Sequence, residues 1–151
     1  MSKEHGGFAL VVSRFNGEVT EGLLRGALAY LHEHNIRPVP SDIYYAPGAF
    51  EIPLIAKTLA SSGRYRGVIC LGCVIKGETA HFEFISLGAT FGLMQASLET
   101  EVPISFGILT SYSEEQACAR SGDNEANKGR EAAAACLETA NLLELIKNTS
   151  H

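Results

Sequence analysis

Apolar residues fall into two kinds of segment along this chain: short, nearly unbroken runs, and longer stretches in which they recur at helical spacing. The short runs predict four strands, at residues 8–15, 42–46, 67–75 and 104–109. The longer stretches predict five helices, over about 19–34, 52–61, 81–100, 113–120 and 127–146. Strands that alternate with helices indicate a parallel sheet covered on both faces, so we expect a three-layer α/β/α sandwich.

The composition fits one globular domain over residues 1–151, of which we expect residues 1–7 to form a flexible N-terminal arm. The chain is 46% apolar and 19% charged, and its formal charge of −5 argues against a nucleic-acid partner. No apolar run approaches the ~20 residues that span a bilayer. The N-terminus also lacks the apolar core of a signal peptide, so the sequence predicts a cytoplasmic protein with no membrane partner.

The four cysteines include a C-x-x-C pair, Cys70 and Cys73, which opens two interpretations. The spacing occurs in redox and zinc sites, but a zinc site needs a second pair, and Cys118 and Cys136 are too far apart to supply one. Three residues apart on a strand, Cys70 and Cys73 point to opposite faces. We therefore favour reduced, structural thiols.

Candidate chemistry gathers in the segments that leave the first three strands, because the carboxyl ends of parallel strands form the usual ligand site. Phe15 and Phe50 offer flat apolar faces for a heterocycle, and Glu51 offers a carboxylate. The glycine turn at residues 77–80 precedes a helix, where free N–H groups favour phosphate. It lacks both the P-loop and the G-x-G-x-x-G pattern, so a nucleotide fold is not implied.

Each candidate also has an ordinary structural interpretation. His81, in the first turn of its helix, either transfers protons near physiological pH or helps to cap the helix. For the two phenylalanines the ordinary interpretation is packing in the core, and for Arg120, Lys128 and Glu131 it is an exposed charge. None of these residues decides the function by itself.

Five separated motifs together resemble the lumazine synthase family, in the family's order and over nearly the whole chain. They are residues 14–16 (RFN), 47–53 (PGAFEIP), 71–82, 106–110 (FGILT), and 127–129 (NKG) with Glu131. The resemblance implies a flavodoxin-like fold and the penultimate step of riboflavin biosynthesis. In that step 5-amino-6-(D-ribitylamino)uracil condenses with 3,4-dihydroxy-2-butanone 4-phosphate to give 6,7-dimethyl-8-ribityllumazine, phosphate and water.

The resemblance assigns one set of residues to the pyrimidine substrate with its ribityl chain. Phe15 would stack on the ring, and the backbone of residues 73–75 would contact its polar edge. The full set is Phe15, Ala49, Phe50, Glu51, Cys73, Val74, Ile75 and Phe106.

A second set is assigned to the phosphorylated substrate. Glu78, through its backbone N–H, Thr79 and Arg120 would bind the phosphate, and His81 would shuttle protons. Lys128 and Glu131 would assist nearby. The reaction requires no metal and no cofactor.

The family's sites lie between adjacent subunits of a pentamer, and the position of Phe106 agrees with this arrangement. Phe106 lies near the amino end of its strand, away from the carboxyl-end ligand site of its own sheet. In the family a phenylalanine and a phosphate-binding arginine come from the neighbouring subunit, so the resemblance implies this role for Phe106 and Arg120. Some family members assemble further into a sixty-subunit shell, and many of these shell-forming members carry a basic turn before the Lys-Gly pair. Here that turn, residues 122–127, contains Asp123 and Glu125, so we expect a free pentamer.

Two other functions remain open: an archaeal-type riboflavin synthase of similar fold, and a noncatalytic lumazine- or flavin-binding protein. His81, Thr79 and Arg120 together distinguish these from the synthase, because a passive binder needs no phosphate site beside a base.

Overall fold

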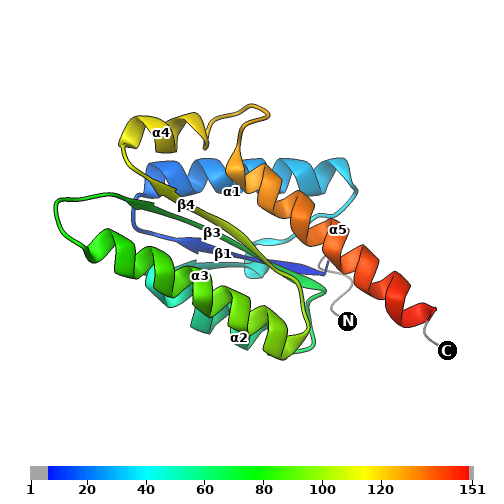
Figure 1. The fold of residues 1–151 in the computed structure, drawn as a ribbon. Helices are drawn as coiled ribbons and strands as arrows, with labels where there is room; N and C mark the ends of the chain where they lie inside the picture. Colours follow the sequence, from blue (N-terminus) through cyan, green and yellow to red (C-terminus); the bar gives the residue numbers. More distant parts are fainter. Residues whose placement is uncertain (1–6, 150–151) are drawn as a thin grey trace.

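The computed structural model describes residues 7–149, whose four strands form one parallel sheet in the order β2-β1-β3-β4 (Figure 1). The strands are β1 (Phe8–Ser13), β2 (Ile43–Ala46), β3 (Gly67–Ile75) and β4 (Ile104–Ser111). Helices cover both faces of the sheet, which confirms the predicted flavodoxin-like α/β/α sandwich. The expected N-terminal arm of residues 1–7 lies, except for Gly7, outside the described residues.

The helices divide between the two faces of the sheet (Figure 1). One face carries α1 (Gly17–Glu33), α4 (Glu114–Ala119) and α5 (Lys128–Asn148), and the other carries α2 (Ile52–Ser61) and α3 (His81–Thr100). Two short 3₁₀ turns, η2 (Pro40–Asp42) and η3 (Ala49–Glu51), were not predicted. Within residues 7–149, no helix has the length and apolarity that a bilayer crossing requires.

Alternate residues of the strands supply two separate cores. On β1, Phe8, Leu10 and Val12 pack toward α1 and α5, whereas Ala9 and Val11 pack toward α2 and α3. Successive side chains of a strand point to opposite faces, so a strand covered on both sides must be apolar throughout. This is why unbroken apolar runs marked the strands in the sequence.

All four cysteines carry free thiols, and Cys70 and Cys73 face opposite cores, as their spacing on a strand predicts. Burial raises the pKa of the Cys73 thiol to about 11 and that of Cys136 to about 12, and it also raises the pKa of Cys70. These three thiols therefore stay protonated near neutral pH and pack as small hydrophobes.

Two strand boundaries differ from the prediction, each for a local reason. β1 ends at Ser13 rather than at residue 15, because Asn16 adopts the left-handed conformation (φ 61°, ψ 49°) and turns the chain into α1. β4 continues two residues beyond the predicted end, because Ser111 still pairs with Ile75 of β3.

Glycines bring α1 and α5 into direct backbone contact. A Cβ at Gly129 of α5 would overlap the carbonyl oxygen of Leu23 in α1. On the same side of α1, a Cβ at Gly22 would overlap the carbonyl oxygen of Ser121, in the segment that leads to α5. Because the partners are backbone atoms, no change of side-chain rotamer relieves these overlaps. The contact between α1 and α5 therefore has no room for a residue larger than glycine at position 129.

Gly129→Ala should lower the free energy of unfolding by about 3 kcal/mol, since the helices must separate to admit the methyl group. A thermal scan should show this as a Tm lower by roughly 5–10 °C. Gly17→Ala is the matched control: in α1, a Cβ at Gly17 meets nothing within 4 Å, so the Tm should not fall. Equal losses in both variants would contradict the close helix contact.

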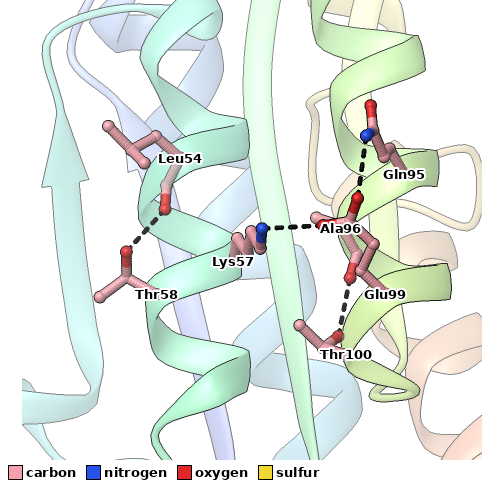
Figure 2. Close-up of polar contacts among 7 residues, drawn as sticks. All are labelled: Leu54, Lys57, Thr58, Gln95, Ala96, Glu99 and Thr100. Atoms are coloured by element: carbon pink, nitrogen blue, oxygen red, sulfur yellow. Dashed lines mark hydrogen bonds and ion pairs between the residues drawn. The ribbon is translucent and has the colours of Figure 1, made fainter.

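On the other face, α2 and α3 lie side by side and are joined by an ion pair. Lys57 Nζ lies 2.8 Å from Glu99 Oε1, and Gln95 Nε2 donates to the other carboxylate oxygen at 2.9 Å. Figure 2 shows Lys57 pointing from α2 toward Glu99 of α3. Both partners of the ion pair are about half exposed, so solvent screens their attraction and the pair adds little to stability. The close approach of the helices has a different cause, because Gly92 leaves room that Pro53 fills.

A buried polar cluster ties β2 to the start of β3, at the amino ends of the strands. The Tyr65 hydroxyl donates to Asp42 Oδ1 at 3.0 Å and lies 3.0 Å from the Tyr44 hydroxyl. The Val39 N–H donates to the other carboxylate oxygen at 2.9 Å. Burial and these hydrogen bonds raise the pKa of Tyr65, so its hydroxyl remains a donor.

Candidate active site

A cavity of about 710 Å³ opens at the carboxyl ends of β1, β2 and β3. These ends meet where the strand order reverses, between β1 and β3, which is the usual ligand position in open α/β sheets. Nine of the predicted site residues line it: Phe15, Ala49, Phe50, Glu51, Cys73, Val74, Ile75, Thr79 and His81.

β3 extends past its neighbour β1 into this cavity. The pairing of β1 with β3 ends at Val12 and Leu71, whereas β3 stays paired with β4 as far as Ile75 and Ser111. Residues 72–75 therefore lack a strand partner on the β1 side, and their backbone groups there need another partner. An unpaired strand edge of this kind can hydrogen-bond the polar edge of a flat heterocycle.

Asn16 occupies part of this open edge. Its side-chain amide donates to the carbonyl oxygen of Cys73 at 2.9 Å. The N–H and C=O of one strand residue point to the same side, so the N–H of Cys73 and both backbone groups of Ile75 share this orientation. Asn16 was not among the predicted site residues. Its signal was an asparagine before glycine at a strand end, which favours the left-handed conformation that it adopts.

Two exposed aromatic rings form walls of the cavity. Phe15, just after β1, is 70% exposed, and Phe50, in η3, is 58% exposed, so packing in the core is wrong for both. Between β2 and α2, η3 also holds the buried Ala49 and the exposed Glu51, whose carboxylate is available to a ligand. Exposed ring faces beside a carboxylate suit a planar ligand that carries hydrogen-bond donors.

The loop between β3 and α3 supplies groups for an anion. Within the described chain, the backbone N–H groups of residues 77–80 donate no hydrogen bond, and they precede the positive end of α3. Thr79 Oγ1 accepts from the His81 N–H at 3.3 Å, which leaves the hydroxyl proton of Thr79 free. Glu78 is exposed and lines neither this cavity nor the second one, described below.

The imidazole of His81 lines the first cavity from the first residue of α3. The helix-cap position belongs to Ala80, and the imidazole makes no hydrogen bond within residues 7–149. The ring is therefore not used to cap the helix and is free to exchange protons with a ligand.

A second cavity, of about 450 Å³, lies beside the edge strand β4. It is lined by the other four predicted residues, Phe106, Arg120, Lys128 and Glu131. Lys128 Nζ pairs with Glu131 Oε1 at 2.6 Å, although Lys128 begins α5, where the helix dipole disfavours a cation. Because Arg120 adds a second cation against this single carboxylate, the cavity favours a negatively charged ligand.

An aromatic pair stands between the two cavities. Phe82 of α3 lines the first, Tyr112 after β4 lines the second, and their ring centroids are 6.0 Å apart. The structure thus brings together two sets of predicted residues, but within one chain it does not bring His81 and Arg120 to the same cavity. Glu114, at the start of α4, also lines the first cavity, and no sequence signal singled it out. Among residues 7–149, no three His, Cys, Asp or Glu side chains cluster closely enough to hold a metal ion.

Known proteins are similar to this sequence over most of its length. The family model of 6,7-dimethyl-8-ribityllumazine synthase matches residues 6–144. The 6,7-dimethyl-8-ribityllumazine synthase 1 of Caulobacter vibrioides is 63% identical over 142 residues, which cover 94% of this chain and 93% of the relative. The 6,7-dimethyl-8-ribityllumazine synthase of Salinibacter ruber is 52% identical over 136 residues, which cover 90% of this chain and 87% of the relative. The resemblance found in the motifs is confirmed: the chain belongs to the 6,7-dimethyl-8-ribityllumazine synthase family.

Proposed function

We propose that this chain condenses 5-amino-6-(D-ribitylamino)uracil with 3,4-dihydroxy-2-butanone 4-phosphate to form 6,7-dimethyl-8-ribityllumazine, the penultimate step of riboflavin biosynthesis. One observation carries the proposal: a single cavity combines exposed phenylalanine rings, the unpaired edge of β3, and His81 beside an anion-binding loop. Membership of the family supports the same activity, because both relatives are named for it.

The pyrimidine substrate fits the first cavity by shape and by hydrogen bonding. Its ring stacks on Phe15, and its polar edge meets the backbone of Cys73 and Ile75, where β1 leaves β3 unpaired. The ribityl chain lies along η3, where the Glu51 carboxylate accepts hydrogen bonds from its hydroxyl groups.

The proposed reaction needs proton transfers but no net oxidation or reduction. The 5-amino group of the pyrimidine attacks the ketone carbon, water leaves, and an imine forms. Phosphate is then eliminated, and the ribityl-bearing nitrogen closes the second ring with loss of water. His81 takes and returns the protons, while Thr79 and the free N–H groups before α3 hold the departing phosphate. Much of the acceleration comes from holding both substrates in register.

The phosphate also requires cations that the first cavity lacks. No arginine or lysine of the described chain lines that cavity, whereas Arg120 and Lys128 line the second. We therefore place the second cavity of one subunit against the first cavity of its neighbour, so that Phe106, Arg120, Lys128 and Glu131 complete the adjacent site. Each site then consists of two halves from two subunits.

The outward face of α3 supports such an assembly. It carries five large apolar side chains at alternating spacings of three and four residues, each more than half exposed: Phe84, Leu87, Phe91, Met94 and Leu98. This spacing is typical of helices that pack against one another, and a contiguous apolar stripe marks an interface. The stripe supports a homo-oligomer in which α3 helices meet, and we favour a pentamer.

The loop at residues 121–127 bears on whether pentamers assemble further. Asp123 and Glu125 are both exposed there, and their like charges would repel one another wherever two such loops met. This favours a free pentamer over the sixty-subunit shell. Light scattering on the purified protein distinguishes the two assemblies by mass.

Mixing the purified protein with both substrates should produce the lumazine chromophore, followed by absorbance and fluorescence, far faster than the uncatalysed condensation. Reactions that lack one substrate are the controls. A riboflavin synthase would instead consume added lumazine, and a noncatalytic binder would change the fluorescence of added lumazine without making more. Absence of product from folded, oligomeric protein would overturn the proposal.

A further inference from the structure

Asn127 is a buried polar residue to which the proposed mechanism gives no role. It is 2% exposed, and as the N-cap of α5 its Oδ1 accepts from the Arg130 N–H at 3.0 Å. Its Nδ2 donates to the carbonyl oxygen of Gly22 on α1 at 3.1 Å and to that of Gly122 at 2.7 Å. One side chain thus joins α1, the loop at residues 121–127, and α5.

That loop has the two cations of the second cavity at its ends. Arg120 precedes it and Lys128 follows it, and the Lys128 N–H donates to the Arg120 carbonyl oxygen at 2.7 Å. The two cations therefore share one backbone junction. Residues 122–126 are exposed or half-buried. Within the described chain, the hydrogen bond that fixes this loop to α1 is the one from Asn127 to Gly22.

The amide of Asn127 rests directly on α1. A Cβ at Gly26 would overlap its Oδ1, so the amide fills the space that this glycine leaves. Gly22 and Gly26 lie one turn apart on the same face of α1, close to the Leu23 carbonyl against which Gly129 packs. The amide is therefore held on a helix whose own position is fixed by the core.

We propose that Asn127 is a positioning residue for phosphate binding, because its hydrogen bonds to Gly22 and Gly122 set the joint position of Arg120 and Lys128. The inference rests on the proposed function, in which these cations bind the phosphate of the butanone substrate. A shift of about 1 Å in such groups misaligns their charge-assisted hydrogen bonds and lowers the rate by as much as 100-fold.

The variant Asn127→Asp separates positioning from helix capping. Aspartate keeps the shape and the oxygen that caps α5, but it donates no hydrogen bond to Gly22 or Gly122. We expect kcat/KM for the butanone phosphate to fall about 30-fold, through a raised KM. The Kd of the lumazine product, which carries no phosphate, should change less than about twofold in a fluorescence titration. Asn127→Ser, which keeps a capping hydroxyl, serves for the same measurements if the aspartate variant does not fold.

Two control variants isolate the buried hydrogen bonds. Asn124→Ala removes a hydrogen bond in the exposed part of the loop, where Oδ1 accepts from the Ala126 N–H at 2.8 Å, and it should leave KM unchanged. Tyr65→Phe removes a buried hydrogen bond in the cluster at the amino ends of the strands. It should lower the Tm and leave the KM of both substrates unchanged.

The outcomes separate this inference from the function on which it rests. If Arg120→Ala raises KM for the butanone phosphate but Asn127→Asp does not, the positioning role is wrong and the proposed function stands. If Arg120→Ala has no effect either, the proposed phosphate site fails, and this inference fails with it. If lumazine binding weakens as much as kcat/KM falls, Asn127 is merely structural and the inference is overturned.

Discussion

Refolding equal amounts of the His81→Ala and Arg120→Ala variants together should restore activity that neither variant has by itself. Each variant alone should lose about 100-fold or more in kcat/KM, because one lacks the proton relay and the other lacks a charge-assisted bond to phosphate. In a mixed oligomer, some interfaces join an intact His81 to an intact Arg120. Random assortment makes these about one quarter of all interfaces, so about a quarter of wild-type activity should return in the lumazine assay.

A second mixture makes the result decisive. Wild-type chains are refolded with an equal amount of a His81→Ala/Arg120→Ala double variant. If each site lies between two subunits, about a quarter of the activity of an all-wild-type oligomer should remain. If each chain holds a whole site, about half should remain. Variants mixed without refolding control for exchange of subunits between intact oligomers. No recovery in the first mixture, together with about half activity in the second, would show that the site does not lie between subunits.

Phe91→Glu should dissociate the oligomer and abolish activity with it. Phe91 is the middle residue of the α3 stripe and is 66% exposed in the single chain, so the substitution leaves the core of the subunit untouched. Packing copies of α3 together would bury one carboxylate from every subunit without a partner. Sedimentation should show monomers, circular dichroism should stay helical, and kcat should fall about 100-fold or more because each site loses half of its residues.

The matched control is Phe91→Leu, which keeps an apolar side chain at the same position of the stripe. It should assemble and turn over like the wild type. An oligomer that persists in Phe91→Glu at unchanged activity would exclude the α3 stripe as the subunit interface.

The order of strands and helices could be predicted because each element carries a local pattern. Strands covered on both sides must be apolar throughout, and in the helices apolar residues recur at helical spacing. The extent of β1 relative to β3 could not be predicted in the same way. It depends on the backbone conformation of Asn16 and on where pairing between distant segments stops, at Val12 and Leu71.

The candidate site likewise has one part that local sequence patterns predict and one part that they do not. Residues at the carboxyl ends of β1, β2 and β3 could be predicted to meet, because parallel strands place those ends at one edge of the sheet. The set beside β4 came from the resemblance alone. Its geometry depends on Asn127 bonding to Gly22, a contact between residues 105 positions apart that no local pattern encodes.

The overhang of β3 beyond β1 has a consequence for how the enzyme's specificity tolerates mutation. In the proposed complex, the pyrimidine lies where a longer β1 would continue, and it meets N–H and C=O groups that nearly every residue type carries. The side chain of Cys73 meanwhile turns into the core. Core packing therefore limits which side chains can occupy this edge. The hydrogen bonds offered to the ring come from the backbone, so they should survive a substitution that leaves the fold intact. In the proposed complex, the open edge of β3 would hydrogen-bond the ring as it would another strand.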